Sequence, residues 1–431
     1  MAIWQASTAG AMLAQIVLIT HAFGIGGYGR FAVVVAFVDL VGGCLNLRVG
    51  YASTTFGARW LARDARVAAG VFQFGFVIDL ATAAAATVLV AALAFVVGSD
   101  VAGGGSGELM AIYGLALLGP GLSRTSFVIL RLLDRFALIA AYQWLLELGR
   151  IVLLVAAIAL FDSLLSVVVA VVVAALGAGV ANLVVAARIY RRVHGLSLAR
   201  PQLQALDRNE RRAMLRMMAH TLIISYSRVA QTQLPTVLLG AIAGTTQAGL
   251  YKVGMAAGAT VGQLIGPASN ALLPRLSRLW AADALGELRT LVFRASVISA
   301  AAMGTMFAAV VVFADPILRF LGGGPAGEAA STVLVLGAAT QALYGLVFWH
   351  STLLFAAGRT APMSVVSVAA AVVHVLAMLV LVPPLGADGA AIALLISQAL
   401  VNVALTTLAL RTLRAGIDAA NDCAGRPARI S

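Results

Sequence analysis

The stretch Gly29-Arg30-Phe31-Ala32-Val33-Val34-Val35-Ala36 has a counterpart 220 residues later, Gly249-Leu250-Tyr251-Lys252-Val253-Gly254-Met255-Ala256. Both stretches follow the pattern Gly-x-aromatic-x-Val-x-x-Ala. A second pair has almost the same offset, because Arg59-Trp60-Leu61-Ala62-Arg63-Asp64-Ala65 parallels Arg278-Leu279-Trp280-Ala281-Ala282-Asp283-Ala284, 219 residues later. Two matches at nearly one offset indicate a duplication, so we expect two similar halves.

The composition places both halves in a membrane. Of the 431 residues, 61% are hydrophobic and 11% are charged, and the mean hydropathy is +1.00. Soluble domains carry about 25% charged residues, so this chain has too few polar side chains to cover a water-facing surface. These values exclude a soluble enzyme, a secreted disulfide-rich scaffold and a disordered protein. The two cysteines, Cys44 and Cys423, indicate neither a disulfide framework nor a metal site.

Apolar runs separated by charged or Gly/Pro-rich breaks predict an all-α integral membrane protein with twelve transmembrane helices. The first run starts almost at Met1 without a basic leader, so we interpret it as the first span and not as a signal peptide. The expected spans are residues 3–23, 30–49, 68–97, 109–130, 136–160, 164–189, 218–242, 249–273, 293–314, 329–356, 361–382 and 389–411.

The basic residues predict the orientation of these spans. With a cytoplasmic N-terminus, 23 of the 29 Lys and Arg residues fall in cytoplasmic connections or in the tail, whereas only Arg30 and Arg319 fall on the opposite side. The positive-inside rule describes this asymmetry. We therefore expect both termini in the cytoplasm. The same rule accounts for the net charge of +12 without a nucleic-acid partner.

The duplication and the charge pattern together predict the domain organisation. We expect an N-terminal six-helix bundle at 1–190, a basic cytoplasmic linker at 191–217, a C-terminal six-helix bundle at 218–414 and a cytoplasmic tail at 415–431. Because each half holds an even number of spans, the halves form a parallel repeat about a pseudo-twofold axis along the membrane normal. Transporters with repeated halves bind substrate between them and alternate access by rocking.

Several turns carry a resemblance to a known family. The chain resembles the oligosaccharide flippases of the MATE-like superfamily, the Wzx-type exporters of lipid-linked polysaccharide units. The similar segments are Phe23-Gly24 with Tyr28-Gly29-Arg30-Phe31, Ala248-Gly249-Leu250-Tyr251-Lys252-Val253, Leu273-Pro274-Arg275-Leu276-Ser277, Phe355-Ala356-Ala357-Gly358-Arg359 and Leu385-Gly386-Ala387-Asp388-Gly389-Ala390-Ala391.

The resemblance implies two six-helix bundles around a central cavity in the bacterial cytoplasmic membrane. It implies transport of an undecaprenyl-pyrophosphate-linked oligosaccharide to the outer leaflet, with membrane lipids, a polysaccharide polymerase and glycosyltransferases as partners. It implies no cofactor beyond a coupling proton or sodium ion. A membrane polymerase or ligase is disfavoured because the longest outward loop has only about a dozen residues, too few for a catalytic loop.

Basic residues inside the expected spans are candidates for binding a pyrophosphate. A charge at mid-membrane depth costs about 2.5–3.5 kcal/mol on insertion scales unless it faces a cavity or a partner. Arg150 and Arg228 lie roughly 21 Å and 15 Å into their spans at 1.5 Å per residue. Arg124 and Lys252 lie nearer the ends of theirs. Arg150 could instead pair with Glu147, three residues earlier, and Arg124 could extend to the lipid head groups.

Acidic residues inside the spans are candidates for the coupling ion. Asp39, Asp79 and Glu147 could take up a proton or a sodium ion, or they could form structural pairs with basic neighbours. His374 could relay protons or simply join two helices.

The sign of these charges bears on the main alternative, a cation-coupled exporter of drugs from the same superfamily. Cationic drugs favour an acidic, aromatic pocket, whereas a pyrophosphate favours a basic one. The intramembrane set holds three acidic and four basic residues. This small basic excess favours the flippase.

Overall fold

The computed structural model contains all 431 residues and describes the backbone of 2–198, 202–282, 284–322 and 324–424. Every regular element in these ranges is a helix, so the all-α prediction is confirmed. Side chains are described in the same ranges except at 2–9, 99, 220–225, 227, 228, 263, 264, 267, 270, 271, 325, 326, 360 and 416–424.

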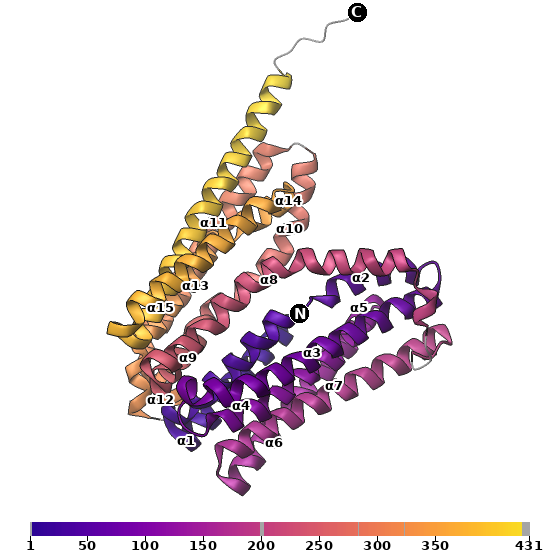
Figure 1. Ribbon diagram of the computed structural model, residues 1–431. Helices are drawn as coiled ribbons and strands as arrows, with labels where there is room; N and C mark the ends of the chain where they lie inside the picture. Colours follow the sequence, from indigo (N-terminus) through magenta and orange to yellow (C-terminus); the bar gives the residue numbers. More distant parts are fainter. Residues whose placement is uncertain (1, 199–201, 283, 323, 425–431) are drawn as a thin grey trace, which may run out of the picture. The chain divides into compact units, whose positions relative to one another are not determined.

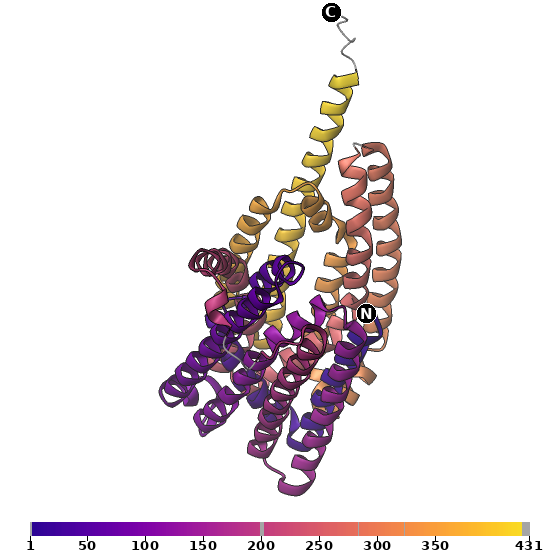
Figure 2. The same cartoon turned by 90° about the vertical axis from the view of Figure 1, so that its right-hand side faces the viewer.

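The chain forms two compact units (Figures 1 and 2). The N-terminal unit is Ser7–Gly249, and the C-terminal unit is Leu250–Ser431 together with Met1–Ala6. The boundary lies beyond the basic segment because α8 packs against α2 and α3. The division into two sets of six spans stays a prediction.

The elements follow one another with short connections. Those that lie wholly or mainly in the N-terminal unit are α1 (Ala2–Leu45), α2 (Val49–Leu61), α3 (Ala65–Ala102), α4 (Ser106–Gly114), η1 (Leu115–Leu117), α5 (Leu118–Leu132), α6 (Phe136–Phe161), α7 (Leu164–His194), η2 (Leu203–Ala205) and α8 (Arg208–Ala243). The others are α9 (Thr245–Gly258), η3 (Ala259–Leu264), α10 (Ile265–Ala281), α11 (Leu285–Val312), α12 (Ala314–Gly322), η4 (Pro325–Ala330), α13 (Ser331–Leu346), α14 (Trp349–Ala356) and α15 (Thr360–Ala424).

Two of these helices consist of two legs joined at a glycine. Gly24 in α1 has φ 68° and ψ 177°, and Gly386 in α15 has φ 56° and ψ −128°. Positive φ is readily adopted by glycine. Each long helix thus covers two expected spans. Within the described residues, eight helices are long and apolar enough to cross a membrane, and α1 and α15 are among them. The total of twelve spans and the orientation of the termini stay predictions.

The N-terminal unit packs around α3, which contacts α2, α4, α5 and α8, while α7 contacts α5 and α6 (Figure 1). Phe72 of α3 and Tyr190 of α7 meet edge to face with ring centroids 5.9 Å apart. The hydroxyl of Tyr190 donates to the carbonyl oxygen of Ala65 at 2.6 Å. This buried aromatic ring with its hydrogen-bonded hydroxyl holds α3 and α7 together. The contact lies at the ends of the two helices that the charge pattern predicts to be cytoplasmic.

Much of the basic segment at 191–217 is ordered against this unit. The amide of Gln73 on α3 donates to the carbonyl of Leu198 at 2.8 Å and accepts from the backbone N–H of Gln202 at 2.7 Å. Leu206 and Met214 are buried. The segment therefore differs from the simple linker that its polarity predicts, because its scattered apolar residues pack on α3.

In the C-terminal unit, α13 contacts α11, α15 and η3, and α10 contacts α11 and α14. Large apolar side chains remain on the outer helix faces of both units. Phe95, Leu160, Ile298, Val312 and Val380 each expose 70% or more of their surface. Large apolar side chains exposed to this degree are unfavourable in water but suit contact with lipid. The protein is thus a multi-pass membrane protein.

Candidate functional site

Asp79 of α3 is the most buried acidic residue in the described part of the chain, with 1% of its surface exposed. Its Oδ2 accepts a hydrogen bond from the hydroxyl of Thr125 on α5 at 2.9 Å. The guanidinium Nη1 of Arg124 lies 3.9 Å from Oδ1, which has no hydrogen-bond partner among the described residues. A Cβ on Gly121 would lie 3.3 Å from the carbonyl oxygen of Asp79, so α5 approaches α3 closely here.

Arg124 also borders a cavity of about 360 Å³ between the start of α2 and the second half of α5. The side of α5 that carries Arg124 carries Arg131 two turns later. Arg48, in the connection between α1 and α2, adds a third guanidinium group. The complete lining is Asn46, Arg48, Gly50, Tyr51, Thr54, Arg124, Phe127, Val128 and Arg131.

The backbone at Arg48 shapes one wall of this cavity. Arg48 adopts the left-handed conformation, with φ 52° and ψ 37°, immediately before α2 begins. The side chain of Asn46 accepts a hydrogen bond from the backbone N–H of Arg48 at 3.0 Å and so supports the break between α1 and α2. Left-handed backbone at a non-glycine residue costs energy and concentrates at functional sites.

The electrostatics of this cavity favour an anion. Its lining contains three arginines and no carboxylate. α2 begins at the cavity without a side-chain cap, so the N–H groups of its first turn add partial positive charge. Asp79, on the other side of Arg124, offsets only part of this charge because it carries one negative charge against three guanidinium groups. We call this arrangement the basic cavity.

A second polar group of the N-terminal unit contains Asp39 of α1. The amide Nε2 of Gln233 on α8 donates to Oδ2 of Asp39 at 3.4 Å, and Asp39 has at least one further interaction.

Arg150 and Glu147 form an ion pair on α6, with Nη2 and Oε2 2.6 Å apart. This is the structural alternative that their three-residue spacing predicts. Both side chains are about one-third exposed or less, at 26% and 33%. Arg124 is also paired, with Asp79, but its 3.9 Å separation is longer than the 2.6 Å of this pair, so Arg150 is the more strongly neutralised of the two.

Lys252 and His374 are not among the residues that line the basic cavity. Lys252 of α9, in the C-terminal unit, is half-buried and has an interaction partner. His374 of α15 is fully buried, and its Nδ1 lies 3.4 Å from the hydroxyl of Ser397, a contact between the two legs of α15. Arg228 lies in α8, but its side chain is outside the described residues.

Sequence reasoning treated Arg48 and Arg131 only as charges that set topology. Asn46 and Thr54 were not among the predicted site residues. A usable signal existed, since Asn46-Leu47-Arg48 interrupts an apolar run and Arg131 follows Arg124 at two-turn spacing. In the described residues, no group of three or more His, Cys, Asp or Glu side chains is placed to hold a metal ion.

Comparisons with known proteins agree with this architecture. Solved structures similar to this chain include a multidrug resistance MATE family transporter of the MOP superfamily in an inward-facing conformation. It has a TM-score of 0.74 and 16% identity, with 97% of this chain and 99% of that chain covered. The Vibrio cholerae MATE transporter VcmN gives a TM-score of 0.62 at 13% identity, covering 96% and 94%. No curated protein matches the chain.

A third similar structure is a MOP superfamily transporter from Pyrococcus furiosus, described as having a binding pocket of reversed polarity that suggests a different function. Its TM-score is 0.65 at 15% identity, with 96% of this chain and 94% of that chain covered. The family model for "Polysaccharide biosynthesis protein" matches residues 1–280. The chain therefore belongs to the polysaccharide biosynthesis protein family, and its fold is similar to that of MATE transporters of the MOP superfamily.

Proposed function

We propose that this transporter flips undecaprenyl-pyrophosphate-linked oligosaccharide units from the inner to the outer leaflet of the bacterial cytoplasmic membrane by alternating access. The observation that carries the proposal is the basic cavity, with three arginines and no carboxylate in its lining. A pyrophosphate group carries negative charge on several oxygens. Arginine binds such oxygens through a planar fork of N–H donors that stays charged at every physiological pH.

The same cavity disfavours the alternative function, export of cationic drugs. A cation beside Arg48, Arg124 and Arg131 would meet repulsion from three like charges in a site partly shielded from water. The Pyrococcus furiosus relative supports the use of pocket polarity to separate functions within this superfamily. Family membership supports the same choice, because the family is described by polysaccharide biosynthesis and not by drug export.

Arg228 is the candidate that would extend the basic cavity toward α8. A Cβ on Gly43 of α1 would lie 2.7 Å from the side chain of Val229, so α1 and α8 are in contact one residue from Arg228. Gly43 precedes Asn46 of the basic cavity by one helical turn. We therefore assign Arg228 to the second phosphate of the pyrophosphate, with Arg150 and Lys252 as weaker candidates because both have other partners.

The coupling ion in this proposal is a proton or sodium ion at Asp39, because Asp39 contacts Gln233 of α8 and uptake of an ion there would alter the contact between α1 and α8. A polysaccharide polymerase and glycosyltransferases are the partners that would consume and supply the transported unit.

The proposal is tested by binding to the purified full chain in lipid nanodiscs. The probes are undecaprenyl pyrophosphate and the cation tetraphenylphosphonium. We expect Arg131→Ala and Arg228→Ala each to weaken pyrophosphate binding about tenfold or more, because each removes a charge-assisted hydrogen bond. Lysine at either position should restore only part of the affinity.

Arg135→Ala is the matched control, because Arg135 is an exposed arginine four residues beyond Arg131 that does not line the cavity. The control should bind as the wild type does. The flippase proposal would be wrong if Arg131→Ala and Arg228→Ala both kept the wild-type affinity for pyrophosphate. If the protein also bound tetraphenylphosphonium tightly, the drug-exporter function would be favoured instead.

A further inference from the structure

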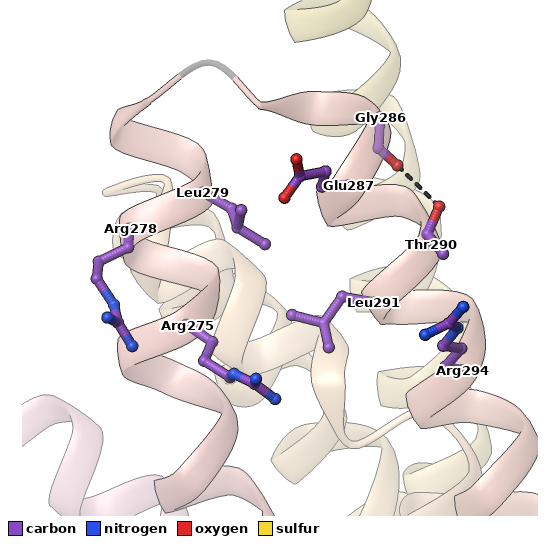
Figure 3. Close-up of a pocket in the computed structure, with 8 residues that line it drawn as sticks. All are labelled: Arg275, Arg278, Leu279, Gly286, Glu287, Thr290, Leu291 and Arg294. Carbon is purple, nitrogen blue, oxygen red and sulfur yellow. Dashed lines mark hydrogen bonds between the residues drawn. The ribbon is translucent and has the colours of Figure 1, made fainter.

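A second cavity lies in the C-terminal unit, between the end of α10 and the start of α11 (Figure 3). Its volume is about 680 Å³. Arg275, Leu279 and Leu291 point into the space between the two helices, while Arg278 and Arg294 flank it (Figure 3). The charge distribution predicts this connection to be cytoplasmic. None of these residues belongs to the basic cavity.

The charges of this second cavity are not neutralised locally. Glu287 is the one acidic residue in its lining, which leaves a net charge of two positive units. Among the described residues, no carboxylate lies within 4.0 Å of the guanidinium groups of Arg275, Arg278 or Arg294. Unpaired arginines on two facing helices repel each other, so an anion between them would stabilise this arrangement.

An apolar surface continues from the cavity along α11. Val297 and Ile298 follow Arg294 by three and four residues, so they lie on the same side of the helix. They expose 53% and 70% of their surfaces. Leu279 and Leu291 form the apolar part of the cavity itself. A free phosphate ion would use only the arginines, whereas a lipid would use both the arginines and this apolar surface.

We propose that the cavity between α10 and α11 binds the head group of an anionic phospholipid of the cytoplasmic leaflet. Arg275 and Arg294 hold its phosphate, and its acyl chains lie along Val297 and Ile298. Basic pockets between transmembrane helices on the cytoplasmic side bind lipid head groups with phosphates in this way. The net charge of two matches a lipid with two phosphates better than a lipid with one. The bound lipid holds the α10–α11 hairpin at the membrane surface.

Native mass spectrometry of the purified full chain tests this site. The probes are diphosphatidylglycerol, phosphatidylglycerol and zwitterionic phosphatidylcholine, added in that expected order of affinity. Each arginine near an anionic lipid contributes a factor of about five. Arg275→Gln combined with Arg294→Gln should therefore weaken diphosphatidylglycerol binding about 25-fold. Both side chains are exposed, so folding should persist.

Arg289→Gln is the matched control, because Arg289 is exposed on α11 but does not line the cavity. It should bind lipid as the wild type does. Equal lipid binding by the double variant, or an equal loss in the control, would overturn the proposal. So would displacement of diphosphatidylglycerol by an equal concentration of inorganic phosphate, since the site would then recognise the free ion. If Arg131→Ala and Arg228→Ala do not weaken pyrophosphate binding, the proposed function fails, but the lipid-binding result at the cavity between α10 and α11 is unaffected.

Discussion

Gly29 and Gly249, the first residues of the two repeated sequence patterns, pack against each other backbone to backbone. A Cβ on Gly249 would lie 3.1 Å from the Cα of Gly29 and would overlap the carbonyl oxygen of Ile25. A Cβ on Gly29 would lie 2.9 Å from the backbone nitrogen of Gly249 and would overlap the carbonyl oxygen of Thr245. Ile25 and Thr245 each precede their glycine by four residues, so the contact is reciprocal. The pseudo-twofold repeat that the sequence predicts would produce such a self-complementary contact.

This contact predicts a specific pattern of stability changes. Gly29→Ala and Gly249→Ala should each destabilise the protein by about 1–3 kcal/mol, because a methyl group has no room against rigid backbone. The double variant should deviate from the sum of the two by at least about 0.5 kcal/mol, since one helix separation relieves both clashes. Unfolding by SDS titration in micelles measures these values.

Gly177→Ala serves as the control for these substitutions, because a Cβ on Gly177 of α7 meets no atom within 4 Å. It should leave stability unchanged or raise it slightly, as alanine favours helix over glycine. Strict additivity of Gly29→Ala and Gly249→Ala would show that the two glycines are not coupled.

The pair of Asp79 and Arg124 makes a second prediction about stability. Arg124→Gln should destabilise the protein by about 2 kcal/mol, because Asp79 stays buried with only Thr125 as partner. The one-third exposure of Arg124 keeps the effect below that of a fully buried pair. Adding Asp79→Asn should recover most of the loss, since no buried charge is then unpaired. SDS titration of the single and double variants measures their free energies of unfolding. A double variant less stable than Arg124→Gln alone would contradict the prediction.

Hydropathy and charge predicted some of the helices closely. The expected spans 136–160 and 164–189 correspond to α6 (Phe136–Phe161) and α7 (Leu164–His194). Bilayer thickness sets the length of an apolar run, so the signal is local and strong. The pair of Glu147 and Arg150 was equally predictable, because three-residue spacing brings two side chains together on any helix.

The basic cavity could not be predicted in the same way. Arg48 and Arg131 are 83 residues apart in the sequence, and their common cavity depends on how α2 packs against α5. The hydrogen bond between Thr125 and Asp79 likewise joins two helices. For residues such as Arg48 and Arg131, the hydropathy pattern indicates only that they lie near the ends of apolar segments. Which side chains meet there is decided by helix packing, for which a single sequence carries little signal.

The predicted orientation can be tested with single cysteines in a background of Cys44→Ser and Cys423→Ser. Gly104, in the connection between α3 and α4, is exposed, and a Cβ there meets no atom within 4 Å. Arg192 is exposed at the end of α7. Gly104→Cys should react with a membrane-impermeant maleimide in intact cells, whereas Arg192→Cys should react only after permeabilisation. The reverse pattern would invert the topology.

The last prediction separates coupling from structure at Asp39. Asp39→Asn keeps the shape of the side chain and an oxygen that accepts from Gln233, but it removes the group that takes up a proton or sodium ion. We expect folded protein that still binds undecaprenyl pyrophosphate but no longer responds to an imposed proton or sodium gradient in proteoliposomes. Gln233→Ala removes the 3.4 Å hydrogen bond and keeps the carboxylate, so it should retain gradient dependence. If Asp39→Asn still responds to the gradient, Asp39 has a structural role. A coupling carboxylate would then have to be freed from Arg124 or Arg150 during transport, because both other acidic candidates are paired in this conformation.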